Sequence, residues 1–265
     1  MTLLLFTSVE SACAQKVRLV LAEKQLVWNE QSLNLRRGDQ FAPEYLKLNP
    51  KAVVPTLVHD GVVIRESSII NEYLEEAYPQ PRLSPVDLLQ RSQMRLWVKT
   101  GDDELHPAIG VLTYATVLRH QMNEMKTPQQ LQQHFASITD PKRRERQQQT
   151  HEQGLQSPAA ELAIRNLRQI IMAMDTALSA HQWLVGENYS LADAAFAPYM
   201  VRLHKLGLTE LWRQHPSFAN WLQRVTQREN ALRLENPWGS EKFNAIVNRH
   251  AEAASSDLSK LLQQN

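Results

Sequence analysis

Residues 53–70 read VVPTLVHDGVVIRESSII, and this stretch decides the fold of the chain. Val53–Val58 is apolar and β-branched, and Asp60-Gly61 is the strongest short signal for a β-hairpin. Ser67 and Ser68 then offer N-cap hydroxyls to a segment with apolar residues at helical spacing. The stretch therefore predicts a strand, a tight turn, a second strand and a helix.

Pro55 is unusual inside a strand, because proline removes a hydrogen-bond donor from the ladder. A cis Val54–Pro55 bond would aim the N–H and C=O of Val54 outward, at an extended ligand. The helix that starts at Ser68 offers free N–H groups and a positive dipole end to a carboxylate. Glu66 offers a negative group to an ammonium. A small peptide with a free amino-acid head would fit this combination.

Length and composition set limits on the class of protein. The chain has 265 residues, of which 43% are hydrophobic and 22% charged, so one or two folded domains are expected. The formal net charge of +1 gives no electrostatic case for a nucleic-acid or membrane partner. The single cysteine excludes an internal disulfide and favours a reducing compartment. The apolar residues Leu3–Phe6 follow no basic residue, so we interpret them as a strand and not as a signal peptide.

The segments Val54–Leu57 and Glu66–Ile70 together resemble the glutathione-binding signature of the glutathione S-transferase superfamily. Either segment alone would suit an ordinary hairpin that leads into a capped helix. The resemblance implies that Pro55 is cis and that Val54 pairs with the cysteinyl backbone of glutathione. It also implies that Glu66 and Ser67 hold the γ-glutamyl head.

The order of predicted elements agrees with this resemblance. A strand at 3–7, a helix at 12–24, a strand at 27–33 and a short helix within 38–48 precede the hairpin, and the resulting order β-α-β-α-β-β-α matches a thioredoxin-like domain. No strand is predicted after the hairpin. The resemblance implies an α/β N-terminal thioredoxin-like, glutathione-binding domain over residues 1–80, a linker at 81–87, and an all-α C-terminal helical domain over 88–265 that holds the acceptor pocket.

Several features of the helical half are predicted from local patterns. Gly101 and Pro107 should bend or interrupt a long helix, which would leave Tyr114 at the wall of the acceptor pocket. Residues 125–158 are very polar and predict an exposed insertion with a short helix. The basic cluster at 142–146 inside it has no interleaved aromatic residues, so we interpret it as a solvated helix face.

Ser190-Leu191-Ala192-Asp193 reads as a capping box that opens a buried, largely apolar helix. The same run resembles the N-capping box of the helical domain of glutathione transferases. We therefore interpret Asp193 as structural and not as catalytic. The polar tail from Ser240 predicts one final helix over the cleft.

The reaction of the resembling family needs a thiolate, which a donor at a helix N-terminus would stabilise. Ser8, Ser11 and Cys13 lie in the loop where such a donor belongs. Ser11 matches the active serine of the theta and tau classes and the cysteine position of the omega class, whereas Cys13 matches the active cysteine of the bacterial beta class. We favour Ser11, which could also cap the helix, and expect Cys13 to pack as a small buried residue. By the same alignment, Gln40 occupies the position where theta-class enzymes place a residue that binds the glycyl carboxylate of glutathione. Lys51 is a weaker candidate for this role.

No histidine spacing suggests a metal site, and no dinucleotide or Walker glycine motif occurs. The resemblance implies a cytoplasmic, homodimeric detoxification enzyme that uses glutathione as co-substrate, without a metal, against a hydrophobic electrophile. Three alternatives stay open. The first is the glutathione-dependent cleavage of β-aryl ethers, because residues 94–97 and the insertion look most like β-etherase-type members. The second is thiol transfer through Cys13, and the third is a non-catalytic interaction or regulatory protein.

Overall fold

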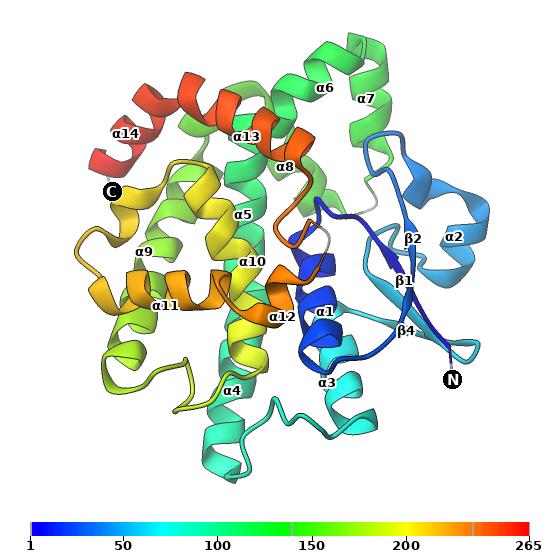
Figure 1. The fold of residues 1–265 in the computed structure, drawn as a ribbon. Coiled ribbons are helices and arrows are strands. Elements are labelled where there is room, and N and C mark those ends of the chain that lie inside the picture. The colour runs from blue at the N-terminus through cyan, green and yellow to red at the C-terminus, as the bar shows by residue number, and fades with distance from the viewer. Residues whose placement is uncertain (1, 139, 235, 265) are drawn as a thin grey trace.

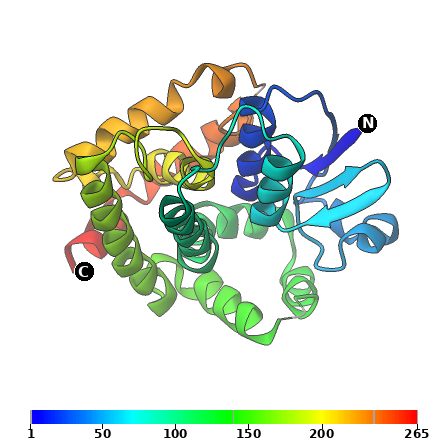
Figure 2. The ribbon, with the colours of Figure 1, turned by 90° about the horizontal axis from the view of Figure 1, so that it is seen from below.

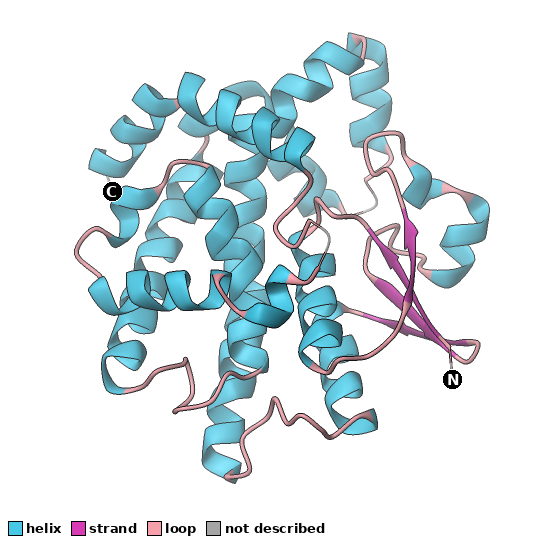
Figure 3. Cartoon of the chain, viewed as in Figure 1, coloured by secondary structure: helices cyan, strands magenta, loops and turns pink. Residues whose placement is uncertain are grey.

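A computed structural model describes residues 2–138, 140–234 and 236–264, with a small sheet beside a larger helical part (Figure 3). The sheet has four strands in the order β2-β1-β3-β4. β1 is parallel to β2 and antiparallel to β3, and β3 is antiparallel to β4. The strands are β1 (Leu3–Thr7), β2 (Asn29–Ser32), β3 (Thr56–His59) and β4 (Val62–Arg65).

Helices cover both faces of this sheet. Figure 1 shows α1 and α3 on the face toward the helical part and α2 on the opposite face. The resulting order of strands and helices confirms the predicted thioredoxin-like domain. The helices are α1 (Ala12–Glu23), α2 (Pro43–Leu48) and α3 (Ser67–Ala77), with a short 3₁₀ turn η1 (Asp39–Phe41) before α2.

The hairpin forms as predicted. His59 pairs with Val62, so Asp60 and Gly61 form a two-residue loop, and their φ angles of 47° and 87° are typical of a type I′ turn. The Val54–Pro55 bond is cis, which also confirms the prediction. The predicted cap of the next helix is wrong, because α3 begins at Ser67 and no side chain caps it.

The helical part begins with one continuous helical path from Leu88 to Met125. Gly101 and Pro107 do not break it. Instead, two π-helical turns interrupt the regular α-helix, and such turns are frequent at functional sites. The path consists of α4 (Leu88–Thr100), the π turn η2 (Gly101–Leu105), α5 (His106–Thr113), the π turn η3 (Tyr114–Leu118) and α6 (Arg119–Met125).

The prediction of one short helix in an exposed insertion is wrong. Two helices, α7 (Pro128–Ala136) and α8 (Pro141–Gln153), occupy this polar stretch. Tyr114 ties α8 to η3, because its hydroxyl lies 3.0 Å from His151 Nδ1. The edge of the Phe135 ring packs on the same imidazole. The stretch is therefore part of the helical domain and is held at a fixed position.

The rest of the chain folds into helices that surround α10, which is buried as predicted (Figure 2). The tail forms two helices instead of the single one expected. None of the helices in the described part of the chain is long and apolar enough to cross a membrane. The remaining elements are η4 (Gly154–Gln156), α9 (Pro158–Ala180), α10 (Leu191–Lys205), η5 (Thr209–Trp212), α11 (Pro216–Thr226), α12 (Glu229–Leu232), α13 (Glu241–Ala253) and α14 (Ser255–Gln264).

Asp193 organises the buried start of α10. Its carboxylate is fully buried and completes the predicted capping box, because it accepts hydrogen bonds from the N–H and hydroxyl of Ser190. It also accepts the N–H of Leu184 at 3.1 Å and Trp221 Nε1 at 2.8 Å. One side chain thus joins the α9–α10 loop, α10 and α11.

We predict that Asp193→Ala lowers the free energy of unfolding by roughly 3–5 kcal/mol, because it removes a cap and leaves four buried donors without this acceptor. Asp87 is the matched control, since it caps α4 at the surface through one bond to the Gln90 N–H. Asp87→Ala should cost only about 0.5–2 kcal/mol. Urea unfolding of both variants measures the difference, and equal losses would contradict the organising role of Asp193.

Candidate functional site

A cavity of about 660 Å³ lies between the thioredoxin-like domain and the helical domain. Its volume is within the range of small-molecule sites, about 300–1,000 Å³. Residues from α1, the β2–α2 segment, the hairpin, α3, α5, η3 and α8 line it. The structure brings all the site residues predicted from the sequence to this one cavity: Ser11, Cys13, Gln40, Val54, Pro55, Glu66 and Ser67.

Val54 lines the cavity at the start of the hairpin. Its N–H and C=O have no hydrogen-bond partner among the residues that the structure describes. The neighbouring Val53 carbonyl, in contrast, accepts bonds from the Tyr45 hydroxyl at 2.6 Å and from Asn49 Nδ2 at 3.0 Å. These bonds fix the backbone just before Val54, so its unpaired groups are held ready for an extended ligand.

Glu66 and Ser67 lie where β4 gives way to α3. Glu66 has φ of 66° and ψ of 115°, a conformation that few non-glycine residues adopt and that tends to occur at functional sites. Its carboxylate pairs with Lys51 Nζ at 2.7 Å, and both side chains are largely exposed. The uncapped N-terminus of α3 lies beside this carboxylate. A positive charge and a carboxylate of one ligand can therefore bind side by side here.

Ser67 and Ser68 have separate surroundings although they are adjacent. Ser67 lines the cavity. The Ser68 oxygen accepts a hydrogen bond of 3.0 Å from the buried ammonium of Lys16. The first serine can therefore bind a ligand, whereas the second holds α3 against α1.

Ser11 is the N-cap of α1, and its oxygen accepts a bond of 3.3 Å from the Ala14 N–H. Capping uses an oxygen lone pair and leaves the hydroxyl proton available. Because Ser11 also lines the cavity, this proton can be donated to a ligand atom at the helix N-terminus. The structure therefore allows Ser11 to cap the helix and donate at the same time.

Cys13 does not simply pack among apolar side chains. Its Sγ lies 3.6 Å from His106 Nδ1 and 3.3 Å from the Tyr199 hydroxyl, and the same hydroxyl is 3.2 Å from His106 Nδ1. His106 and Tyr199 are 93 and 186 residues from Cys13 in the sequence, yet both contact its sulfur atom. His106 directly precedes Pro107, where a bend was predicted, and Tyr199 lies in the predicted buried helix, but the sequence gives no sign that either residue contacts Cys13.

These neighbours change the acidity of the thiol. Burial alone would raise the pKa of Cys13. The hydrogen bond with His106, the charges of His106 and Lys16 and the Tyr199 hydroxyl outweigh burial and lower this pKa from 9.0 to about 7. The contact with Cys13 in turn raises the pKa of His106. Burial and the neighbouring sulfur raise the pKa of Tyr199, so its hydroxyl stays protonated and can donate to the thiolate.

Gln40 lies in η1 at the far edge of the cavity. Its Nε2 donates to the Leu35 carbonyl at 3.2 Å. Its Oε1 is buried without a partner in the described part of the chain. Lys51, the weaker candidate for the same role, is engaged with Glu66 instead.

The wall on the helical side combines apolar and basic residues. Tyr114 lines it, as predicted, together with Pro107, Val111 and Leu118. Arg143 and Arg146 of α8 are exposed, as the predicted solvated helix face requires, and they also line the cavity. The spacing of these arginines predicts a helix, but it carries no information on which face of α8 meets the cavity.

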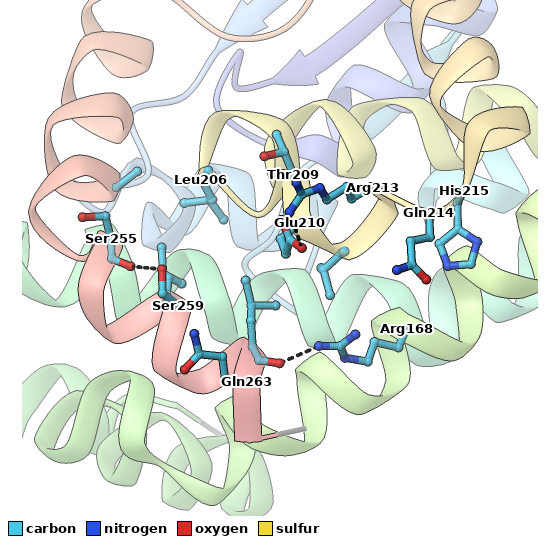
Figure 4. Close-up of a pocket in the computed structure, with 15 residues that line it drawn as sticks. Arg168, Leu206, Thr209, Glu210, Arg213, Gln214, His215, Ser255, Ser259 and Gln263 are labelled. Carbon is cyan, nitrogen blue, oxygen red and sulfur yellow. Dashed lines mark hydrogen bonds and ion pairs between the residues drawn. The ribbon is translucent and has the colours of Figure 1, made fainter.

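A second cavity, of about 670 Å³, lies between α9, η5 and α14 (Figure 4). Arg168 crosses it and donates to the Leu262 carbonyl at 2.6 Å. None of the residues predicted for the site lies there. Across residues 2–138, 140–234 and 236–264, the structure contains no group of His, Cys, Asp and Glu side chains that could hold a metal ion. The cavity at Cys13 is therefore the candidate functional site.

Comparison with protein families gives two matches. Residues 10–77 match the model described as glutathione S-transferase, N-terminal domain. Residues 134–229 match the model described as glutathione S-transferase, C-terminal domain. The second match includes α8 and most of the stretch that was expected to be an insertion.

Individual relatives cover most of the chain at low identity. The chain is 26% identical over 234 residues to Protein LigF of Sphingobium sp. This alignment covers 86% of this chain and 91% of that protein. It is 26% identical over 226 residues to a stringent starvation protein A homolog of Haemophilus ducreyi. This alignment covers 85% of this chain and 86% of that protein. Glutathione S-transferase Z1 of Arabidopsis thaliana is 44% identical over 88 residues, 33% of this chain and 40% of that protein.

Solved structures share the fold. The crystal structure of beta-etherase LigF from Sphingobium sp. strain SYK-6 has a TM-score of 0.77 at 24% identity, with 87% of this chain and 97% of that chain covered. The glutathione transferase F7 of Populus trichocarpa has a TM-score of 0.71 at 19% identity, with 90% and 100% covered.

We predict that Cys13 is alkylated by iodoacetamide with a midpoint near pH 7, because its pKa is lowered to about 7. His106→Asn should move this midpoint to roughly pH 8.5 or above, the range of a thiol without a cationic neighbour. Cys13 is the single cysteine of the chain, so the alkylation rate reports on one group. His181→Asn, at an exposed histidine remote from the cavity, should leave the midpoint unchanged. A wild-type midpoint above pH 8 would refute the activated thiol.

Proposed function

The chain belongs to the glutathione S-transferase superfamily, and from that premise we propose that it activates the thiol of glutathione for attack on an electrophilic small molecule. The observation that carries the proposal is the meeting of Val54, Glu66, Ser67 and Ser11 at one cavity. The unpaired main chain of Val54 suits the cysteinyl backbone of glutathione. Glu66 suits its ammonium, and Ser67 with the α3 N-terminus suits its α-carboxylate.

In the proposed arrangement the sulfur lies at the N-terminus of α1. The Ser11 hydroxyl donates to the thiolate, and the helix dipole stabilises the negative charge. The thiol proton passes to solvent. The sulfur then forms a bond to the electrophilic carbon, and the leaving group departs with its bonding electrons. Gln40 also lines the cavity, and its Oε1 has no partner in the described part of the chain. Its side-chain amide suits the glycyl end of glutathione, either through a bridging water or after rotation of the side chain.

Cleavage of a β-aryl ether is a second candidate that uses the same site. The 26% identity to LigF, over 86% of this chain, favours it. The solved structure of that protein bears the name beta-etherase. In such a reaction the glutathione sulfur attacks the carbon that carries the aryloxy group, the C–O bond breaks, and a phenolate leaves. The Ser11 donor would serve both reactions, since they differ only in the leaving group.

Thiol transfer through Cys13 is a third candidate, and the His106–Tyr199 cluster favours it. A thiol with a pKa of about 7 is roughly half ionised at neutral pH and is a competent nucleophile. The Cys13 thiolate would attack the disulfide bond of an oxidised thiol compound, form a mixed disulfide and release a thiolate. Reduced glutathione would then attack the mixed disulfide and release Cys13.

We further propose a cytoplasmic homodimer that acts in detoxification. Large apolar side chains are exposed on two surfaces, one at β4 and α3 and one at the start of α4. They are Val62, Ile69, Leu88, Leu89 and Leu96, exposed by between 57% and 76%. Pairing of the two surfaces between copies would cover them. A thiolate site in a chain that cannot form an internal disulfide suits a reducing compartment.

We predict that Ser67→Ala weakens glutathione binding by roughly 1.5–3 kcal/mol, because it removes one hydrogen bond to a charged group. Isothermal titration calorimetry measures the loss. Ser68→Ala is the matched control, since the hydroxyl of Ser68 bonds to Lys16. It should lower stability without lowering the affinity for glutathione. Equal affinity in Ser67→Ala and the wild type would remove the basis of the glutathione site, and absence of wild-type binding would favour a non-catalytic interaction protein.

We predict that Ser11→Ala slows conjugation about tenfold to a thousandfold, the range for loss of one oriented donor. The pKa of bound glutathione should rise toward its free value, while Cys13→Ala should be nearly silent. The measurement is the pH profile of conjugation for both variants. The reverse pattern, with a Cys13–glutathione disulfide in the intact mass after oxidation, would establish thiol transfer in place of our first choice.

A further inference from the structure

One stripe of α8 faces the cavity. The lining residues of this helix are Arg143, Arg146, Gln147 and Thr150, spaced as i, i+3, i+4 and i+7. Residues at this spacing lie on one face of an α-helix. The stripe presents two guanidinium groups at its outer end and two neutral polar groups at its inner end.

The position of this stripe is fixed by contacts at its inner end. The Tyr114 hydroxyl lies 3.0 Å from His151 Nδ1, and the Thr150 hydroxyl donates to the Arg146 carbonyl at 2.7 Å. At the other end Asp140 caps the helix by accepting the Arg143 N–H. The two arginines therefore lie on a capped helix that Tyr114 of η3 anchors at its inner end.

Within the described part of the chain, no acidic side chain forms an ion pair with either of these two guanidinium groups. Two carboxylates line the same cavity, and each has a lysine of its own: Asp102 pairs with Lys16 at 2.8 Å and Glu66 pairs with Lys51 at 2.7 Å. Over the residues that the structure describes, neither Arg143 nor Arg146 forms an ion pair. The helical side of the cavity thus carries two uncompensated positive charges.

An apolar wall lies between the arginines and the thiol-activating loop. Pro107, Val111 and Leu118 form it, and Gly110 leaves open space beside it, since an added Cβ there would meet nothing within 4 Å. The wall suits the flat body of an aromatic or aliphatic electrophile. A ligand whose reactive carbon is at Ser11 and whose body covers this wall would place its outer end at α8.

We propose that this cavity takes acceptors that carry a carboxylate, and that Arg143 and Arg146 bind this group; the proposal rests on the proposed function. Guanidinium groups match the planar carboxylate with paired N–H donors. During transfer the glutathione sulfur bonds to the electrophilic carbon, the leaving group takes the electrons of the broken bond, and the carboxylate takes no part. The arginines are specificity-determining residues, and they do not act on the reacting atoms.

The first test measures binding and does not depend on turnover. The probes are 3,5-dinitrobenzoate and 3,5-dinitrobenzamide, which have the same shape but differ in charge and carry no leaving group. In calorimetric titrations of the glutathione-saturated protein, the wild type should bind the benzoate at least about tenfold more tightly than the benzamide. The double variant Arg143→Gln/Arg146→Gln should lose this preference, whereas Lys142→Gln, at a residue of α8 that does not line the cavity, should keep it. A wild type without a preference for the benzoate overturns the proposal.

The second test separates the acceptor from glutathione, which also carries carboxylates. With 4-chloro-3,5-dinitrobenzoate as substrate, the double variant should raise the KM about ten- to a hundredfold at a nearly constant kcat. The kinetics of the corresponding benzamide and the KM for glutathione should stay unchanged. A rise in the KM for glutathione alone would assign the arginines to glutathione and overturn the proposal. If the wild type conjugates neither compound but prefers the benzoate in the titration, the transferase function fails while the carboxylate site stands.

Discussion

The buried ammonium of Lys16 is the constraint on which the rest of the structure depends. Its side chain is fully buried, and a charge in that position costs several kcal/mol unless it is paired. Asp102 Oδ1 at 2.8 Å and Ser68 Oγ at 3.0 Å compensate it, and the Tyr199 ring lies 5.9 Å from the nitrogen. These groups belong to η2, α3 and α10. One lysine of α1 therefore fixes how the two domains meet, and with it the shape of the cavity between them.

The π-helical turn η2 and the residue that follows it supply two of the groups that this arrangement needs. A π turn holds one more residue than an α turn and shifts the faces that follow it. Asp102 lies within this turn and reaches Lys16, while His106 follows directly and reaches Cys13. Gly101, at the start of the turn, allows the Phe196 ring of α10 to approach closely, since an added Cβ would lie 3.3 Å from it. The π turn thus contributes both to the contact between the two domains and to the lowered pKa of Cys13.

The sequence predicted what depends on local chemistry. The turn at Asp60-Gly61 and the capping box of Asp193 depend on residues a few positions apart, the cis bond before Pro55 was implied by the family resemblance, and the structure confirms all three. The contact of His106 and Tyr199 with Cys13 could not be predicted, because it needs the packing of α1, α5 and α10. The position of Arg143 and Arg146 at the cavity could not be predicted for the same reason, since a basic helix face has the same sequence pattern toward solvent and toward a cavity. Gly101 and Pro107 marked the position of an irregularity, but their types did not specify a π turn.

Ser11 and Cys13 are two residues apart, yet the helix start gives them different roles. As the N-cap, Ser11 lies just outside the helix with its hydroxyl proton free, whereas Cys13 lies in the first turn and faces α5 and α10. Both positions lie at the N-terminal end of the same helix dipole, and the charge of Lys16 also lowers the pKa of Cys13. Two thiolates at this distance would repel each other, so a glutathione thiolate at Ser11 would raise the pKa of Cys13 and return it to the thiol form. The proposed conjugation and the alternative thiol transfer would therefore compete for one region of positive potential, and bound reduced glutathione would disfavour the Cys13 reaction.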